Sequence, residues 1–257
     1  MKITWFGAAT ILIETNNNRI LFDPFAGLYG CENHNDIGKF LDEENIFITH
    51  GHFDHLYNVK DILKKGKGTV YCTKTPYKTL KKQRADINKI IVIEPLDIFK
   101  IGNIKIKVLK AKHNKLDMLL FFKRLFSFRS LKFLSNIFFM AENNAVYQEG
   151  RETAAFLIEA ENKKVLVLGS MGLDKKVSYT KNIDVLILPY QGRLDNLKPA
   201  SQIVKIIKPK TVVLNHFDDA FPPLTKSVDT EPFFDKMNVQ YSDIKIIKPE
   251  FEKIIEV

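Results

Sequence analysis

Cysteine is nearly absent from this chain, which limits the kinds of protein that it can be. Only Cys31 and Cys72 occur among 257 residues, far apart and in no CxxC pattern. The sequence therefore predicts neither a disulfide framework nor a thiolate zinc site. The N-terminal run MKITWFGAATILIET also lacks the layout of a secretory signal. We expect a cytoplasmic protein in a reducing compartment.

Long uncharged runs are absent as well, so the sequence predicts no transmembrane helix. Acidic residues are outnumbered, 30 against 39 lysines and arginines, which gives a formal net charge of +9. The lysines are scattered through expected turns and helix faces, which is typical of a solvated surface. Nucleic acid is therefore not the expected partner, and we expect a small-molecule or lipid-like substrate.

Short strand patterns recur in both halves of the chain. ATILIETNNNRILFDP (9–24) aligns without gaps on AFLIEAENKKVLVLG (155–169), each reading as strand, polar turn and strand. No Pro/Gly-rich linker divides the chain. We expect one domain over residues 1–257, in which two related sheets face each other, helices cover the outside and strand-end loops meet at one rim.

Histidine is scarce, yet three of the six histidines fall within the stretch ITHGHFDHL (48–56). His50 and His52 stand two apart at the end of an expected strand, so their side chains point the same way. Asp54 and His55 follow where a helix is expected to begin, and a loop there can aim both into the same cavity. Zinc accepts imidazole and carboxylate ligands together. The packing of a protein core does not require three histidines and an aspartate within six residues, so this pattern indicates a metal site.

Two further histidines end expected strands, His113 after IKIKVLKAK and His216 after TVVLN. Strand ends are where folds of this type gather their active sites. A single histidine at such a place is more often a hydrogen-bonded loop residue. The cluster at 50–55 strongly favours the interpretation of His113 and His216 as additional metal ligands.

THGHFDH resembles the HxHxDH signature of the metallo-β-lactamase superfamily. LFDPF before it, and KAKH, VLGSMG, DVLILPYQG and VVLNH after it, fall in that family's order. Within the superfamily the chain looks most similar to the lactonase-like metal-dependent hydrolases. The resemblance implies an α/β fold, an αββα sandwich of two mixed β-sheets flanked by helices, with a dinuclear metal site at its rim.

The same resemblance implies a role for each matching residue. The first metal would be held by His50, His52 and His113, and the second by Asp54, His55 and His216. Asp23 matches a family aspartate that braces the floor of the site. The expected cofactor is two zinc ions, with manganese or iron as alternatives.

Ser170 departs from the family pattern. Most hydrolases of the superfamily have an aspartate at this place that bridges the two metals, and serine cannot bridge as a carboxylate does. One subclass of lactamases has serine there and keeps two zinc ions. We therefore expect Ser170 to lie near the metals and the second metal to be lost more easily than the first.

A metal-dependent hydrolase is the function that these residues predict. A metal-bound water has its pKa lowered from about 15.7 towards about 7, which supplies hydroxide at neutral pH. Asp54 is the candidate catalytic residue that orients this hydroxide and shuttles its proton. The chain contains no GxSxG elbow. The expected substrate is an ester, lactone or phosphodiester; the alternatives are a nucleic-acid-processing hydrolase or an iron-dependent redox enzyme on the same scaffold.

The segment from Leu116 to Met140 is an insertion rich in aromatic and basic residues. It contains seven phenylalanines and four basic residues, and its first half predicts an amphipathic helix with Lys123, Arg124 and Ser127 on one side. Three interpretations stay open: a helical lid, an oligomer interface, or a helix at an anionic membrane surface. We favour a lid or interface whose aromatic face lines an apolar pocket, which suggests a partly apolar or lipid-like substrate.

Two residues of LPYQGRLD are further candidates for substrate contact, because they follow an expected strand end. These are Tyr190 and Arg193, and the guanidinium of Arg193 would suit an anionic group.

Overall fold

The computed structural model describes residues 1–16, 18–115 and 117–257. Asn17, in the expected turn of the first repeat, and Leu116, the first residue of the expected insertion, lie outside this description. In the described residues the strands form two seven-stranded sheets. The first sheet has the order β14 (Ile254–Glu256), β1 (Lys2–Trp5), β2 (Ile11–Glu14), β3 (Arg19–Phe22), β4 (Asn45–Phe47), β5 (Thr69–Cys72) and β6 (Ile90–Val92). The second has the order β13 (Lys245–Ile247), β12 (Thr211–Asn215), β11 (Val185–Pro189), β10 (Lys163–Leu168), β9 (Ala154–Ala160), β8 (Ile104–Lys110) and β7 (Ile98–Ile101).

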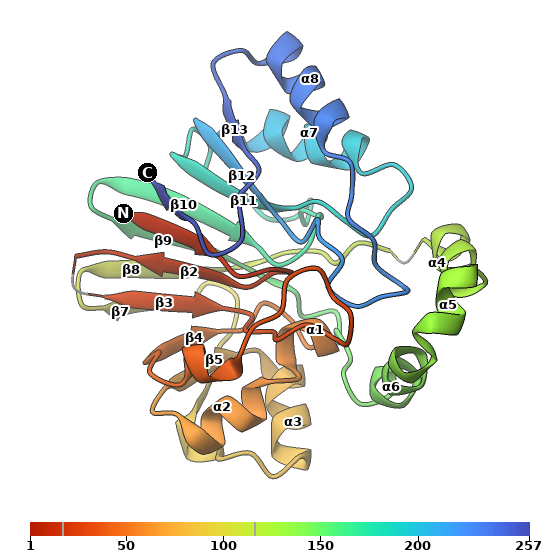
Figure 1. Cartoon of the computed structure of the whole chain (residues 1–257). Helices are drawn as coiled ribbons and strands as arrows, with labels where there is room; N and C mark the ends of the chain where they lie inside the picture. The colour runs from red at the N-terminus through yellow and green to blue at the C-terminus, as the bar shows by residue number, and fades with distance from the viewer. Residues whose placement is uncertain (17, 116) are drawn as a thin grey trace.

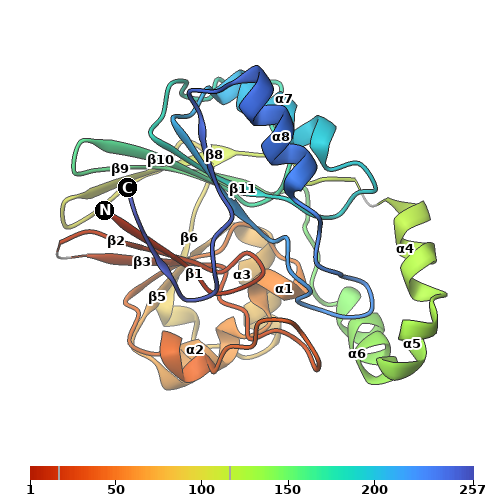
Figure 2. The ribbon, with the colours of Figure 1, turned by 45° about the horizontal axis from the view of Figure 1, so that its top comes forward.

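The helices lie outside the two facing sheets, which confirms the expected αββα sandwich (Figures 1 and 2). On the side of the first sheet lie α1 (Phe53–Leu56), α2 (Val59–Lys65) and α3 (Lys74–Lys82). On the side of the second lie α7 (Leu197–Ile207) and α8 (Glu231–Gln240). Three more helices, α4 (Met118–Leu125), α5 (Phe128–Lys132) and α6 (Leu134–Asn144), stand apart at one side of the sandwich. Short 3-10 helices cover Ile37–Phe40 and Ile87–Lys89.

The core between the sheets is built from apolar side chains of both. Phe22 of β3 and Phe47 of β4 meet Phe156 of β9, with ring centroids 5.5 and 5.3 Å apart. All three rings are fully buried. Burying a phenylalanine is worth about 1.5–3 kcal/mol, so these contacts clamp the sheets together and fix how their strand ends meet.

The two sheets share one plan, which gives the internal repeat a structural meaning. The hairpin β2–β3 is antiparallel and β3 then pairs in parallel with β4; the hairpin β9–β10 is antiparallel and β10 pairs in parallel with β11. The loops after these parallel strands leave from the same edge of each sheet. Residues that follow β3, β4, β10 and β12 are thereby brought towards one rim.

The expected insertion is the helical segment α4–α6, which we call the arm (Figure 1). Its three short helices cover residues 118–144. No helix among the described residues is long and apolar enough to cross a membrane.

Candidate metal centre

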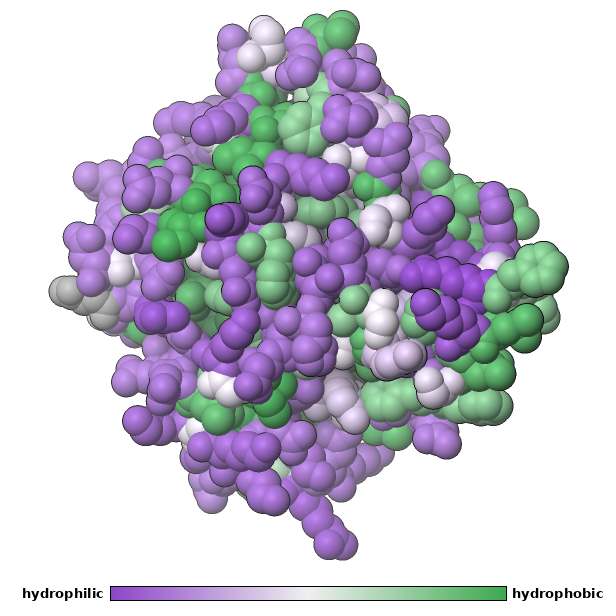
Figure 3. Space-filling model, viewed as in Figure 1, coloured by the Kyte–Doolittle hydropathy of each residue, from purple (hydrophilic) through white to green (hydrophobic). Residues whose placement is uncertain are grey.

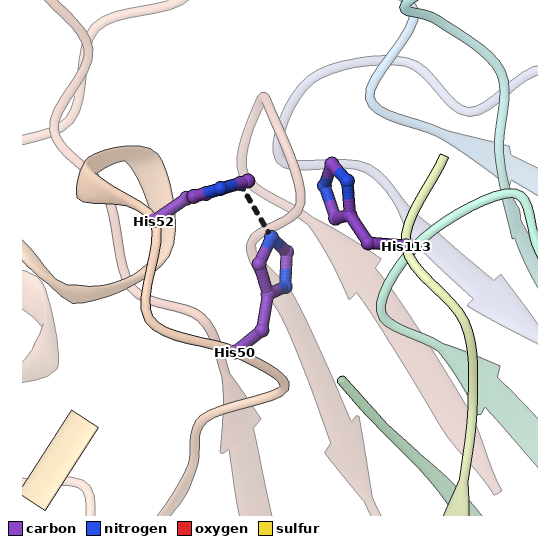
Figure 4. Close-up of side chains that lie close together, drawn as sticks. All are labelled: His50, His52 and His113. Atoms are coloured by element: carbon purple, nitrogen blue, oxygen red, sulfur yellow. Dashed lines mark hydrogen bonds between the residues drawn. The ribbon is translucent and has the colours of Figure 1, made fainter. Parts of the chain in front are cut away.

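Three histidines from both sheets converge on one point. One ring nitrogen from each of His50, His52 and His113 lies within 4.8 Å of the other two (Figure 4). His50 and His52 follow β4, whereas His113 follows β8 of the other sheet. Nε2 of His50 is 3.1 Å from Nδ1 of His52, and the ring centroids of His52 and His113 are 4.5 Å apart. The three residues expected to hold the first metal are thus gathered as a ligand set.

A second set lies directly beside the first. Donor atoms of Asp54, His55 and His216 also fall within 4.8 Å of one another. Nε2 of His216, which follows β12, lies 3.0 Å from Oδ2 of Asp54, and Nε2 of His55 lies 3.5 Å from the same oxygen. The rings of His50 and His55 have centroids only 3.9 Å apart, so the two sets form one continuous cluster.

A close backbone approach holds the loop that carries the first two histidines. Gly51 separates His50 from His52, and a Cβ at this position would lie 2.2 Å from the carbonyl oxygen of Gln148. Only glycine lets the two backbones approach this closely. The absent side chain therefore allows the loop before β9 to pack on the ligand loop.

The charge states of the cluster suit a metal ion. Burial, followed by the neighbouring imidazoles, holds the pKa of His50 well below its usual range. Burial and His113 lower the pKa of His52 to about 4, and burial also lowers the pKa of His113. These three imidazoles are therefore neutral at pH 7, and a neutral imidazole carries the free lone pair that a metal needs.

The second set differs because it contains an anion. Burial opposes ionisation of Asp54, but His55 and His216 outweigh it and lower the pKa of this carboxyl. Burial likewise opposes a charge on His55, yet the carboxylates of Asp23 and Asp54 raise its pKa. One carboxylate and five imidazoles form a donor set that fits zinc, and imidazole also suits iron. The residues present therefore fit the expected metals.

Asp23 and Thr49 orient the imidazoles from behind. Oδ2 of Asp23 is 2.8 Å from Nδ1 of His55, and Oδ1 accepts a hydrogen bond from the backbone N–H of Thr49 at 2.8 Å. The hydroxyl of Thr49 donates to Asp23 Oδ2 at 2.7 Å and lies 3.0 Å from Nδ1 of His50. Such partners fix which ring nitrogen faces the metal. Sequence reasoning missed Thr49, although it directly precedes His50 in the motif.

Ser170 is buried just beyond the end of β10. Its Oγ accepts a hydrogen bond of 3.1 Å from the backbone N–H of Asn114, the residue after His113. Ser170 therefore lies beside the first set, where it holds the His113 loop.

Asp218, in the loop HFDDAFPP after His216, supports the site from outside the two ligand sets. It is fully buried, and its carboxylate accepts hydrogen bonds from the backbone N–H of Ala8 at 3.0 Å and from Nδ2 of Asn33 at 3.0 Å. The carbonyl of Ala8 in turn accepts a 2.7 Å bond from the N–H of His216. Asp218 thus ties the loop that carries His216 to the N-terminal loop. The sequence signal for this role is its position two residues after a histidine that ends a strand.

The two candidate substrate contacts lie in different surroundings. Tyr190 is 2% exposed and its ring packs 5.2 Å from that of Phe233 in the core. Arg193 is partly exposed, and its neighbour Leu194 donates a backbone hydrogen bond of 3.1 Å to Asp117 at the start of the arm. Neither side chain is among the metal-ligand sets, and their contact with substrate stays a prediction.

Comparisons with known proteins agree with this geometry. The profile of the β-lactamase superfamily domain matches residues 2–216. A UPF0173 metal-dependent hydrolase of Staphylococcus aureus is 27% identical over 259 residues, covering 97% of each chain.

Among solved structures, a metallo hydrolase of the archaeon Ignicoccus hospitalis aligns with a TM-score of 0.67 at 18% identity, covering 99% of this chain and 97% of the other. A diiron β-hydroxylase of Streptomyces venezuelae aligns with a TM-score of 0.64 at 13% identity, covering 100% of this chain and 54% of that one. At such identities these two likenesses show the fold alone. With the profile spanning most of its length and the ligand sets in place, the chain belongs to the β-lactamase superfamily, and its curated relatives are named metal-dependent hydrolases.

Proposed function

We propose that this protein is a hydrolase that uses two metal ions, held by the two adjacent ligand sets, to cleave an ester, lactone or phosphodiester. The observation that carries the proposal is the convergence of six donors from three separate segments of the chain into two sets, each within 4.8 Å. Zinc is the proposed metal, since structural and catalytic zinc sites are built from imidazole and carboxylate ligands. The name of the full-length relatives supports the reaction class.

Bound metal ions of this kind supply hydroxide at neutral pH, polarise the electrophile and stabilise the leaving oxygen. Asp54 is the only carboxylate of the six donors, and its lowered pKa keeps it ionised. It is therefore placed to accept a hydrogen bond from the attacking water and to transfer that proton to the leaving oxygen of the substrate. Asp23 and Thr49 hold the rings of His55 and His50 while this happens.

An apolar wall next to the second set supports a partly apolar substrate. The ring of Phe221 lies 6.2 Å from that of His216, and Phe53 lies 5.1 Å from Phe221. Phe139 of the arm extends the wall at 6.3 Å from Phe53. All three rings are partly exposed. An acyl chain or an aromatic leaving group would pack on such a wall, so we favour these over small hydrophilic esters.

The proposal is tested with untagged protein stripped by a chelator and reloaded with zinc, manganese or iron. Metal content is measured for each preparation, and turnover is followed on phosphodiester, lactone, thioester and β-lactam substrates that carry apolar or hydrophilic groups. We expect two zinc ions per chain and turnover of the apolar ester, lactone or phosphodiester. His52→Ala should lose one metal and reduce turnover at least about a thousandfold, since the metal supplies the nucleophile.

His34→Ala is the matched control, because it removes an exposed imidazole outside both ligand sets. It should keep both metals and full turnover. Retention of both metals and of turnover in His52→Ala would refute the ligand assignment. Iron as the only metal bound on purification, with oxygen consumption and no hydrolysis, would instead favour a redox enzyme, for which the fold likeness to a diiron hydroxylase is the precedent.

A further inference from the structure

The arm exposes apolar side chains to an unusual degree. All exposed phenylalanines among the described residues lie in it, and Phe126 and Phe128 are 80% and 94% exposed. The other large apolar side chains that it exposes are Met118, Leu119, Phe122, Leu131, Leu134 and Phe138. Figure 3 shows hydrophobic atoms gathering over the arm at the right of the molecule. Contiguous exposed apolar surface of this kind marks an interaction site.

The inner side of the arm is fixed to the body by polar contacts, so the exposed side is a defined surface. Arg124 donates to the carbonyl of Leu224 at 2.6 Å, and Arg129 donates to the carbonyl of Thr225 at 2.8 Å and pairs with Asp219. Asn136 donates to the carbonyl of Pro222 at 2.7 Å. Both arginines of the arm are thereby used to hold it in place. They are not available to an outside partner.

The charge that remains on the outer side is positive. Residues 118–140 contain no aspartate or glutamate, and the exposed charged side chains among them are Lys123 and Lys132. Lys112 and Lys115, in the segment before the arm, are exposed as well. Aromatic side chains flanked by lysines, without acids, match the boundary of an anionic bilayer, where rings enter the acyl region and lysines reach the headgroups.

A second copy of the chain fits this surface less well. Symmetric pairing of two arms through residues 118–140 would bring Lys123 and Lys132 of both copies together, and these residues contain no aspartate or glutamate to pair with them. An anionic membrane satisfies the same lysines, each worth about 1 kcal/mol near such a surface.

We propose that the outer face of the arm, residues 118–138, docks this protein on the surface of an anionic lipid bilayer. The three short helices lie in the plane of the interface and do not cross it, in keeping with their length. Phe126 and Phe128 enter the boundary between headgroups and acyl chains, and the lysines contact lipid phosphates. The surface is separate from the ligand sets, so docking does not depend on hydrolysis.

The test is flotation of the full-length protein with vesicles of phosphatidylglycerol and phosphatidylcholine, compared with phosphatidylcholine alone. We expect binding to the anionic vesicles that weakens as salt is raised. Phe126→Ser with Phe128→Ser should weaken binding on the order of tenfold for each ring. Lys123→Gln with Lys132→Gln should weaken it roughly fivefold for each lysine and remove the preference for anionic lipid.

Leu96→Ser with Val239→Ser is the matched control, because these residues are 72% and 87% exposed outside the arm. This variant should bind like the wild type. All replaced side chains are exposed, so each variant is expected to fold, which an unchanged melting temperature checks. Absence of vesicle binding by the folded wild type overturns the proposal. So does equal binding by the arm variants, or a dimer in light scattering that Phe126→Ser with Phe128→Ser dissociates without any vesicle binding.

Discussion

Asp23 and His55 form a fully buried pair in which Oδ2 of the carboxylate lies 2.8 Å from Nδ1 of the imidazole. The contact leaves Nε2 of His55 facing Asp54, at 3.5 Å from its Oδ2. A carboxylate behind a ligating histidine fixes the ring and raises its basicity. Asp23 follows β3 and His55 lies in α1, so the pair also joins the loop after β3 to this helix.

Asp23→Asn should therefore weaken the second metal without displacing the first. Loss of the charge behind His55 is expected to reduce affinity for the second metal by about 10–100-fold, the usual effect of removing such a partner. Competition between the protein and a chromogenic chelator measures both affinities. Asp42→Asn, which removes an exposed carboxylate, is the control. Unchanged binding of both metals by Asp23→Asn would contradict the orienting role.

Ser170→Asp should have the opposite effect, because it places a carboxylate beside the ligand sets. A pair of unit charges about 4 Å apart is worth roughly 4 kcal/mol at an effective dielectric of about 20. Even part of this gain would tighten the second metal roughly tenfold or more. Ser170→Asn adds similar volume without charge and should not tighten it. Equal affinities of Ser170→Asp and the wild type would show that position 170 does not face the metals.

The ligand sets could be predicted from the sequence because their signals are local. HxHxDH combines ligand type and spacing in six residues, and a histidine follows shortly after each of the strand patterns of β8 and β12. Two facing sheets with helices outside were expected from the strand patterns and the repeat, whereas the αββα sandwich and the division of the ligands into two sets were implied by the resemblance to the metallo-β-lactamase superfamily. Each of these signals lies within a short stretch of the chain, although the ligands that they mark come from distant segments.

The remaining features depend on contacts between distant residues. The hydrogen bond between Ser170 and Asn114 joins residues 56 apart, and no pattern in either segment predicts it. β14 pairs with β1, with Lys2 opposite Glu256, so it takes the edge of the first sheet that β7 takes in the second. Arg124 was expected on a basic side of a helix, whereas in the structure it reaches the carbonyl of Leu224. Amphipathic spacing predicts which side of a helix a residue occupies, but it does not predict which segment of the chain that side contacts.

Gly51→Ala should disturb the first metal although it removes no ligand. The new methyl group would meet the carbonyl oxygen of Gln148 at 2.2 Å, so either the loop before β9 or the ligand loop has to move. Such overpacking costs about 1–3 kcal/mol, and a shift of His52 away from His113 would break up the ligand set. We expect a lower melting temperature and weaker binding of the first metal, measured by calorimetry. Gly38→Ala is the control, because its methyl group would meet only the carboxylate of Asp36 at 3.2 Å. If Gly51→Ala bound both metals like the wild type, the backbone contact with Gln148 would not be what positions His50 and His52.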